Sequence, residues 1–520
     1  MRVVIRSMGM ACLAVLGTVV LAVAWTAATT VQLAATALIM GGSFHPLSTP
    51  PDDAAGYVNP YLNNAVLGFV NPAASAPTGT GHPGISHVAD GDPWLAVITP
   101  EEFFPIFGSM PLNESVTVGL VNLSSCVRGT GCEVNRDALI DPQPPDGHPA
   151  ADDEFAIFGY SQSALIAALL KRDLIANPGQ TPTVASFFLL ANPMRPNGGI
   201  LARSPVGFTV PILGVTFYGP TPTNSCEAGA CMPTVDAAAQ YDALGGDAPA
   251  SLTNLLAIVN AAAGYHYLHS TLQHASFNDA RYQGSYGDTD YYLYPTQRLP
   301  ILMPFDAFVP SPILTALDAP LRVLIEGAYR RDVNPGIATT VSLLPFHDPI
   351  RTILNLLLAI PTGIDDALAE ATGNPTFRPL GTAPVTTPYG VGGPQLPAPP
   401  DEAEENEVLS LRTEPVGRTD EDGADDAAVG TGADGEVTSG DDGDASATSR
   451  GGDVTDPPER PRIRGPIQFD SDEQGDVPTT EESGTATTAE PELDQAAEEG
   501  AADAEEAADD AGESANADAA

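Results

Sequence analysis

The chain contains little basic charge. Among its 520 residues, 21 are Lys or Arg against 67 Asp or Glu, and the net charge is −46. Lys171 is the only lysine. A protein that binds a nucleic-acid backbone needs a basic face to displace counterions. The composition therefore argues against nucleic acid as a partner.

Cysteine is also scarce. Of five cysteines, Cys12 lies in an apolar run, and the other four form two close pairs, Cys126 with Cys132 and Cys226 with Cys231. Neither CxxC spacing nor a nearby histidine supports a zinc site. In a chain with features of export, the spacing predicts two short-range disulfides, Cys126–Cys132 and Cys226–Cys231, out of three connectivities.

The first residues have the pattern of an export signal. Arg2 and Arg6 precede an apolar run over residues 8–25, and no further charge occurs until Asp52. Small residues at 22–24 and 26–28 suit cleavage, while the length of the run is near the lower limit for crossing a bilayer. We expect residues 1–34 to be a signal peptide or a retained membrane anchor. Either one predicts an exported protein, secreted or anchored in the cell envelope.

The last quarter of the chain lacks apolar periodicity. Residues 401–520 contain 37 acidic and six basic residues, and Phe469 is the single aromatic after Leu411. Such a segment buries too little apolar surface to offset its ordering entropy. We expect a Pro/Gly linker over 376–400 and a disordered acidic tail over 401–520, with a partner-binding arm at 460–469 as the alternative.

Residues 35–375 alternate short apolar runs with longer helical patterns, which predicts an α/β domain with a parallel sheet flanked by helices. Strands are expected at Thr36–Met40, at Trp94–Ile98 and from Glu154. A helix with serine at its start is expected over Ser115–Leu123. Apolar stretches after Leu299 favour core packing, with the wall of an acyl pocket as the alternative.

One segment predicts a strand, a tight turn and a helix in direct succession. Its turn reads Gly159-Tyr-Ser161-Gln-Ser163, with serine in place of the usual second glycine. A serine on such a turn has its hydroxyl lifted above the sheet. The helix that follows offers free N–H groups and a positive dipole end to a developing oxyanion. Ser161 is therefore a candidate nucleophile.

A nucleophilic serine needs a histidine base and a carboxylate that orients the base, and on this scaffold both come later in the chain. The histidines after Ser161 are His266, His269, His274 and His347. The carboxylates before them, within reach of a strand end, are Asp236, Asp242 and Asp247. Residue types and order alone do not choose among them.

Several longer motifs resemble one known family. They read ALIMGGSFHPL (37–47), TPEEFFPI (99–106), SVTVGLVNL (115–123), FGYSQSA (158–164), LLANPMRPNGGILAR (189–203), VPILGVTFYGPTPT (210–223) and NAAAGYHYLH (260–269). The chain resembles the mycobacterial PE-PPE C-terminal domain family, serine hydrolases related to cutinases, from about 37 to 305 with a weaker extension to about 373. We expect an export signal in place of the N-terminal modules that give the family its name.

The resemblance implies a cutinase-like α/β-hydrolase fold with Ser161 as nucleophile and His269 as base. It places the acid at Asp242, with Asp247 as the alternate, because the chain has one residue more between these two acids than the family pattern. The backbone N–H of Gln162 and the turn at Gly42 and Ser43 would form the oxyanion hole. No metal ion and no organic cofactor is expected.

These assignments imply an exported serine carboxylesterase or lipase that acts on an acyl ester or glycolipid substrate. Two other functions stay open on the sequence. One is an envelope acyltransferase that moves acyl groups between glycolipids by the same chemistry. The other is a non-catalytic envelope binding protein that uses the fold and the acidic tail.

Overall fold

The computed structural model describes residues 35–48, 54–79, 81–136, 138, 149–150, 153–179 and 184–400. The predicted export signal and the predicted acidic tail lie outside these residues. The strands are β1 (Thr36–Ile39), β2 (Trp94–Ala96), β3 (Glu154–Tyr160), β4 (Val184–Leu190), β5 (Thr209–Val210), β6 (Val215–Thr216), β7 (Thr234–Ala239), β8 (Arg281–Tyr286) and β9 (Thr289–Tyr294).

The α-helices are α2 (Asn59–Asn63), α3 (Asn71–Ala74), α4 (Leu112–Val127), α5 (Gln162–Ala176), α6 (Leu255–Gly264), α7 (Ser270–Leu272), α8 (Ser311–Glu326) and α9 (Pro349–Thr372). Shorter 3₁₀ and π segments are η2 (Ala54–Val58), η3 (Asn64–Val70), η4 (Ile200–Ala202), η5 (Tyr265–His269), η6 (Phe277–Asp279) and η7 (Pro300–Phe305).

Seven strands form one sheet in the order β2-β1-β3-β4-β7-β9-β8, and only β8 runs antiparallel to its neighbour. The predicted mixed α/β architecture is thus confirmed. The central strands β3 and β4 are almost continuously apolar because helices cover both faces of a parallel sheet. The helix predicted at Ser115–Leu123 is longer and begins at Leu112, so Ser115 lies inside it and is buried.

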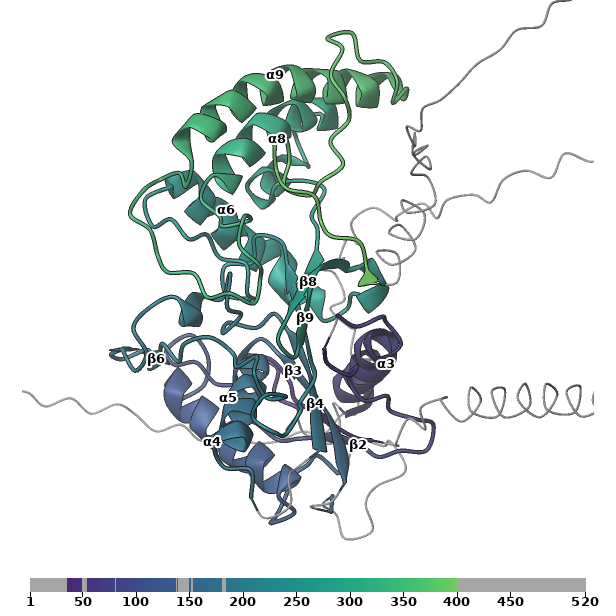
Figure 1. Cartoon of the computed structure of the whole chain (residues 1–520), viewed down its shortest axis with the longest axis vertical. Helices are drawn as coiled ribbons and strands as arrows, with labels where there is room; N and C mark the ends of the chain where they lie inside the picture. The colour runs from purple at the N-terminus through teal and green to yellow at the C-terminus, as the bar shows by residue number, and fades with distance from the viewer. Residues whose placement is uncertain are drawn as a thin grey trace, which may run out of the picture. The chain divides into compact units, whose positions relative to one another are not determined.

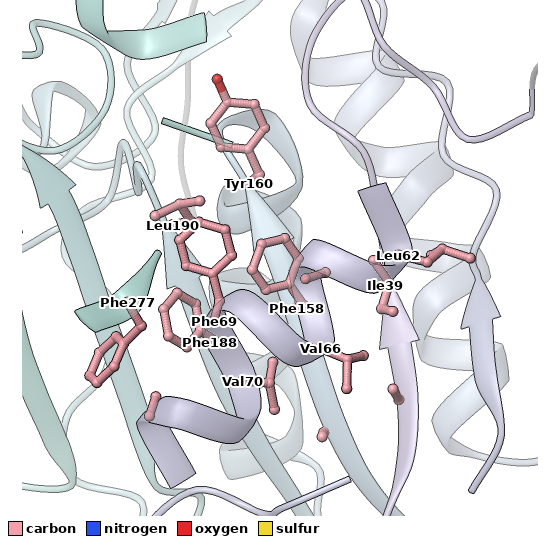
Figure 2. Packing of buried hydrophobic residues seen from close by; sticks show 14 of the residues in the cluster. Ile39, Leu62, Val66, Phe69, Val70, Phe158, Tyr160, Phe188, Leu190 and Phe277 are labelled. Carbon is pink, nitrogen blue, oxygen red and sulfur yellow. The ribbon is translucent and has the colours of Figure 1, made fainter. Parts of the chain in front are cut away.

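Alternate residues of the strands point to opposite faces of the sheet, and each face has its own apolar core. On one face, Phe158 of β3 stacks on Phe188 of β4 with ring centroids 5.6 Å apart. Phe69 of η3 contacts both rings, at 5.7 and 5.6 Å (Figure 2). On the other face, Ile157 and Leu189 pack with buried residues of α4 and α5.

A cap of helices, made of α6, η7, α8 and α9, lies beyond the carboxyl end of β7. Its buried core includes Tyr241, Ala257, Leu299, Leu314 and Ile325. Figure 1 shows α8 between α9 and the rest of this cap. The cap therefore packs directly on Tyr241, the residue before one of the candidate acids.

Residues 376–400, predicted to be a linker, contact the cap. Tyr389 is buried, and its hydroxyl accepts a hydrogen bond from Gln283. Arg322 of α8 donates to the carbonyl of Pro388. This segment therefore packs against α8 and the sheet.

Both predicted disulfides are present. Cys126 at the end of α4 is bonded to Cys132, and Cys226 is bonded to Cys231. Each closes a short loop, so each acts locally. The close spacing of the cysteines, in a chain with the pattern of an export signal, predicts this pairing.

The only lysine lies in a buried polar cluster that ties α5 to the sheet. Lys171 Nζ donates to Asp288 Oδ1 at 2.6 Å and to Thr234 Oγ1 at 2.8 Å. Both charged side chains have an exposed fraction of 0%. Asp288 also accepts from the backbone N–H and the hydroxyl of Ser225, next to the second disulfide. Burial lowers the pKa of Lys171 below its ordinary value, and the charge of Asp288 offsets this effect only in part.

Removal of this lysine charge should destabilise the fold. In Lys171→Met, Asp288 loses its buried counterion, and we expect the free energy of unfolding to fall by about 3–5 kcal/mol. The double variant Lys171→Met/Asp288→Asn should recover part of this loss because no uncompensated charge remains. Urea unfolding followed by circular dichroism measures both. A single variant as stable as the wild type would show that the pair contributes little.

Candidate active site

Ser161 occupies the turn between β3 and α5 that the sequence predicted. Its backbone has φ 59° and ψ −114°, a conformation that a residue with a side chain rarely adopts. The backbone N–H of Ser161 donates to the carbonyl of Leu190 on β4 at 2.9 Å, which holds the turn against the sheet. The hydroxyl is therefore presented at the carboxyl edge of the strands, as expected.

The neighbours of Ser161 are small because strand and helix crowd together here. A Cβ on Gly159 would lie 2.5 Å from the carbonyl oxygen of Ser163, so only glycine fits. Ser163, which replaces the expected second glycine, is fully buried. Its hydroxyl accepts a hydrogen bond from the N–H of Tyr160 at 2.8 Å and donates one to the Tyr160 carbonyl at 3.1 Å. A serine thus closes the turn by hydrogen bonds where a glycine would only leave room.

The structure brings together one histidine and one aspartate beside Ser161. His269, at the end of η5, places Nε2 2.8 Å from Ser161 Oγ. Its Nδ1 lies 2.6 Å from Asp242 Oδ2. Ser161 and His269 are 9% and 8% exposed, and Asp242 is fully buried. The three side chains thus form one hydrogen-bonded chain that is closed to solvent at Asp242 and slightly exposed at His269 and Ser161.

A glycine allows the histidine to reach this place. Gly264 ends α6 just before η5, and a Cβ there would lie 2.1 Å from the carbonyl oxygen of Tyr241. The end of α6 can therefore approach the backbone after β7 this closely only because residue 264 is glycine. The π-helical turn of η5 then carries His269 over Ser161.

Two tyrosines fix the imidazole ring. The ring of Tyr160 stacks on His269 with centroids 5.4 Å apart, and the ring of Tyr265 lies 4.8 Å away. The hydroxyl of Tyr160 donates to the carbonyl of His269. Burial and the charge of Asp242 raise the pKa of Tyr160, so this hydroxyl stays protonated. Sequence reasoning did not find Tyr160 as a partner of the histidine, although it sits beside the serine.

The carboxylate of Asp242 is held by backbone donors. Its Oδ1 accepts from the N–H of Gly245 at 2.9 Å and of Leu244 at 3.2 Å, which leaves Oδ2 for His269. A Cβ on Gly245 would lie 2.0 Å from Oδ2, so glycine is required at this position. The segment between the two predicted acids thus folds back on Asp242 through a glycine turn.

Asp247, the alternate acid, makes different contacts. Its two carboxylate oxygens pair with Arg331 at 2.6 and 2.9 Å, and Oδ2 accepts from the N–H of Tyr241 at 2.8 Å. No contact with His269 is found among its described interactions. Arg331 also pairs with Glu326, the last residue of α8, so Asp247 ties the loop that carries Asp242 to the end of this helix.

The other candidates lie elsewhere. His266, His274 and His347 are exposed, and His347 lies 3.4 Å from Asp332. Asp236 is buried on β7 and pairs with Arg195 at 2.5 Å. Only Asp242 and His269, of the residues that chain order left open, are brought to Ser161.

The residues predicted to bind an oxyanion contact one another. Ser43 donates its hydroxyl to Gln162 Oε1 at 2.9 Å, and Gln162 Nε2 donates to Ser115 Oγ at 2.7 Å. Gln162 is the first residue of α5, so its backbone N–H has no acceptor within the helix. A Cβ on Gly42 would meet the Tyr160 ring at 2.6 Å. The turn after β1 is thus packed tightly against the serine turn.

A buried acid supports this turn, and sequence reasoning missed it. Glu101 is fully buried, and its carbonyl accepts from the N–H of Phe44 at 3.2 Å. Its Oε1 accepts from the Thr99 hydroxyl at 2.5 Å, whereas Oε2 has no hydrogen-bond partner among the described residues. Burial raises the pKa of Glu101 from 4.5 to about 8, against a smaller opposing effect of Thr99. In the sequence, the only signal for Glu101 is its place in the TPEEFFPI motif.

The fold and the site define a mixed α/β protein with a serine, a histidine and an aspartate in hydrogen-bond contact at the carboxyl ends of parallel strands. Residues 93–330 match the PE-PPE domain family. The chain therefore carries a PE-PPE domain, as the sequence motifs implied. Helix α9 and Gly42 lie outside the matched residues.

Relatives of the chain are PE and PPE proteins of Mycobacterium tuberculosis. It is 31% identical over 363 residues to the uncharacterised PPE family protein PPE42 of strain CDC 1551 / Oshkosh, which covers 66% of this chain and 53% of the relative. It is 35% identical over 248 residues to Esterase PE16 of strain ATCC 25618 / H37Rv, covering 45% of this chain and 46% of the relative. PE family protein PE3 of the same strain is 30% identical over 366 residues, covering 68% and 66%. The chain thus spans about half the length of the first two relatives.

The pKa of Glu101 makes a prediction about stability and pH. The unfolded chain releases this proton near pH 4.5, whereas the folded protein keeps it to about pH 8. The stabilising contribution is therefore complete below the first value and is lost as the pH rises to the second. The melting temperature of the wild type should therefore decrease as the pH is raised from 5 to 8. In Glu101→Gln we expect this decrease to be smaller by roughly 5 °C.

The adjacent Glu102→Gln is the matched control. Backbone donors at Met110 and Ser109 lower the pKa of Glu102, so it is ionised in both states across this range. Its removal should leave the pH profile parallel to that of the wild type. Equal profiles for Glu101→Gln and the wild type would contradict a buried neutral acid at position 101.

Proposed function

We propose that this protein is a serine esterase or lipase of the α/β-hydrolase type that hydrolyses acyl esters. The observation that carries the proposal is the contact of Ser161 Oγ with His269 Nε2 at 2.8 Å, with Asp242 on the other ring nitrogen at 2.6 Å. This is the arrangement of nucleophile, base and orienting acid that acyl transfer uses. The similarity to Esterase PE16 supports the same class of reaction.

In the proposed reaction, His269 takes the proton of Ser161 as its oxygen attacks the ester carbonyl. Asp242 holds the imidazole and stabilises the charge that forms on it. The carbonyl oxygen becomes an oxyanion that the N–H of Gln162 and the turn at Gly42 and Ser43 bind. Collapse expels the alcohol, which takes the proton from His269 and leaves an acyl group on Ser161. Water then repeats the sequence and releases the acid.

The strained backbone of Ser161 suits this role. The turn points the hydroxyl away from β3 and places the start of α5 behind the developing negative charge. Ser43 donates to the Gln162 side chain at 2.9 Å, so in the proposed mechanism its hydroxyl orders the turn around Gln162. We place the reaction outside the cytoplasm, in the cell envelope, because the first residues of the chain have the pattern of an export signal.

Removal of the Ser161 hydroxyl should abolish the activity. We expect Ser161→Ala to lower kcat/KM for nitrophenyl esters at least about 1,000-fold. A fluorophosphonate probe should label the wild type and leave the variant unlabelled. Ser75→Ala, at an exposed serine directly after α3, is the control. Equal rates of hydrolysis by the wild type and Ser161→Ala would contradict the enzyme proposal.

Product analysis with an added sugar alcohol distinguishes hydrolysis from acyl transfer, because acyl transfer would give the ester of the sugar alcohol.

The two acids should respond differently. Asp242→Asn removes the carboxylate that orients His269, and we expect kcat to fall by about 10,000-fold with the fold intact. Asp247→Asn weakens the pair with Arg331 and should lower the melting temperature while kcat of the folded protein stays within about tenfold of wild type. Steady-state kinetics and thermal unfolding on both variants test this. The reverse pattern would make Asp247 the acid.

A further inference from the structure

Helix α9 has its large and small residues on unexpected sides. The side packed on α8 presents buried small or polar residues, among them Thr352, Ala359, Thr362 and Gly363. The outward side presents large aliphatic residues that are 43% to 73% exposed, namely Ile350, Ile353, Leu354, Leu357, Leu358 and Ile364. A surface helix of a water-soluble protein buries its aliphatic side. The prediction that the apolar stretches after Leu299 pack in the core is therefore wrong for most of the large residues of α9.

The inner contact explains why no large residue is needed there. A Cβ on Gly363 would lie 2.4 Å from the carbonyl oxygen of Ala316, so α8 and α9 approach as closely as backbone allows. The hydroxyls of Thr352 and Thr362 donate to carbonyls of their own helix, at Asp348 and Leu358. Small residues between helices with large aliphatic residues outward are the arrangement that helices adopt against hydrocarbon.

The outward side carries no charge along its centre. From Thr352 to Gly363 the helix has no Asp, Glu, Lys or Arg. The charges near its ends are engaged by the segment that follows: Asp366 pairs with Arg378, and Arg351 donates to the carbonyl of Gly392. Asp365 is buried and accepts from the N–H groups of Leu380 and Thr382. The ends are thus turned toward protein, and the aliphatic side is left uncovered by the described residues.

The length of α9 fits a lipid layer. It has 24 residues and is apolar enough by composition to cross a membrane. One side is committed to α8, however, so the helix is amphipathic in its setting and suits lying along a lipid surface with the aliphatic side in the acyl region. Figure 1 shows α9 at the edge of the described fold with α8 beneath it.

The chain's charge selects the kind of lipid. A protein of net charge −46, with no basic residue in the middle of the docking helix, is repelled by anionic headgroups. A neutral or zwitterionic layer presents no such barrier. A second copy of the chain would have to bring two strongly acidic proteins together.

The cap connects this helix to the candidate site. Leu314 and Ile325 of α8 pack with Ala257 of α6 and with Tyr241, the residue before Asp242. Helix α6 runs on into η5 and His269, and its Leu255 and Val259 are 73% and 54% exposed. Apolar surface is therefore present both on α9 and on the helix that leads to the histidine.

We propose that the aliphatic side of α9 docks in the acyl region of a neutral lipid layer and so presents lipid esters to Ser161. The docking itself is independent of the proposed function. The presentation of substrate to Ser161 rests on the proposed function. The substrates implied are long-chain acyl esters held in such a layer, in preference to dissolved short-chain esters.

The first experiment uses the full chain with a tryptophan probe on the helix. Leu357→Trp places the probe on the aliphatic side, and Val121→Trp places it on α4, where Val121 has an exposure of 62% against 63% for Leu357. With vesicles of brominated phosphatidylcholine, we expect blue-shifted and quenched emission from Leu357→Trp alone, relative to wild type. The comparison is insensitive to the apolar run at 8–25, because binding through that run would affect both variants equally. Added phosphatidylglycerol should weaken the signal, and salt should restore it.

The second experiment measures hydrolysis. Leu354→Gln/Leu357→Gln/Leu358→Gln keeps good helix formers and removes the aliphatic centre. Val121→Gln/Val206→Gln/Ile212→Gln removes three aliphatic residues of similar or greater exposure elsewhere. We expect the first variant to lose at least about tenfold in rate on a long-chain ester in phosphatidylcholine vesicles, equivalent to 1.4 kcal/mol. Its rate on dissolved nitrophenyl acetate should equal wild type, and the control variant should be unchanged on both.

Each failure has its own meaning. Absence of a spectral change in Leu357→Trp overturns the docking, even if esters are hydrolysed. Quenching of that probe with no hydrolysis of any ester by the wild type keeps the docking and removes the proposed function. A wild type that is dimeric without lipid and a Gln variant that is monomeric in sedimentation would assign the surface to a second copy, and the lipid proposal would be wrong.

Discussion

The candidate site depends on one close approach between two backbones. Gly264 touches the carbonyl of Tyr241 where α6 meets the end of β7, and any side chain there would collide at 2.1 Å. This contact sets the start of η5 relative to the loop that carries Asp242. His269 follows five residues later, between Asp242 and Ser161. If the helix stood farther away, neither hydrogen bond of the imidazole could form.

Around this contact, the protein separates residues that touch the histidine from residues that hold the loops. Asp242 faces His269, whereas Asp247 pairs with Arg331, which follows α8 in the chain. Ser161 faces His269, whereas Ser163 closes the turn and Ser43 holds Gln162. The two aspartates share one side-chain chemistry and the three serines another, so the partner alone decides the role of each.

The cap has two unlike sides. Toward the sheet it buries Tyr241 and positions the loop of Asp242 through Arg331. Away from the sheet it presents the aliphatic side of α9 to solvent. The small residues between α8 and α9 make this possible, because they let the helices pack without using the large residues. One element can therefore support the site and offer a surface for an apolar partner.

The sequence by itself determined the strand–turn–helix at Ser161 and both disulfides, because each is encoded by residues near one another in the chain. It also determined the alternation of strands and helices, a pattern that predicts a parallel sheet. Family motifs, not spacing, pointed to His269 and Asp242. Only the tertiary structure decided the rest. Glu101, Tyr160 and Gly264 owe their positions to contacts with distant segments, and the exposure of α9 depends on which side α8 covers. Periodicity reveals that a helix has an apolar side, but what lies against that side is a property of the assembled fold.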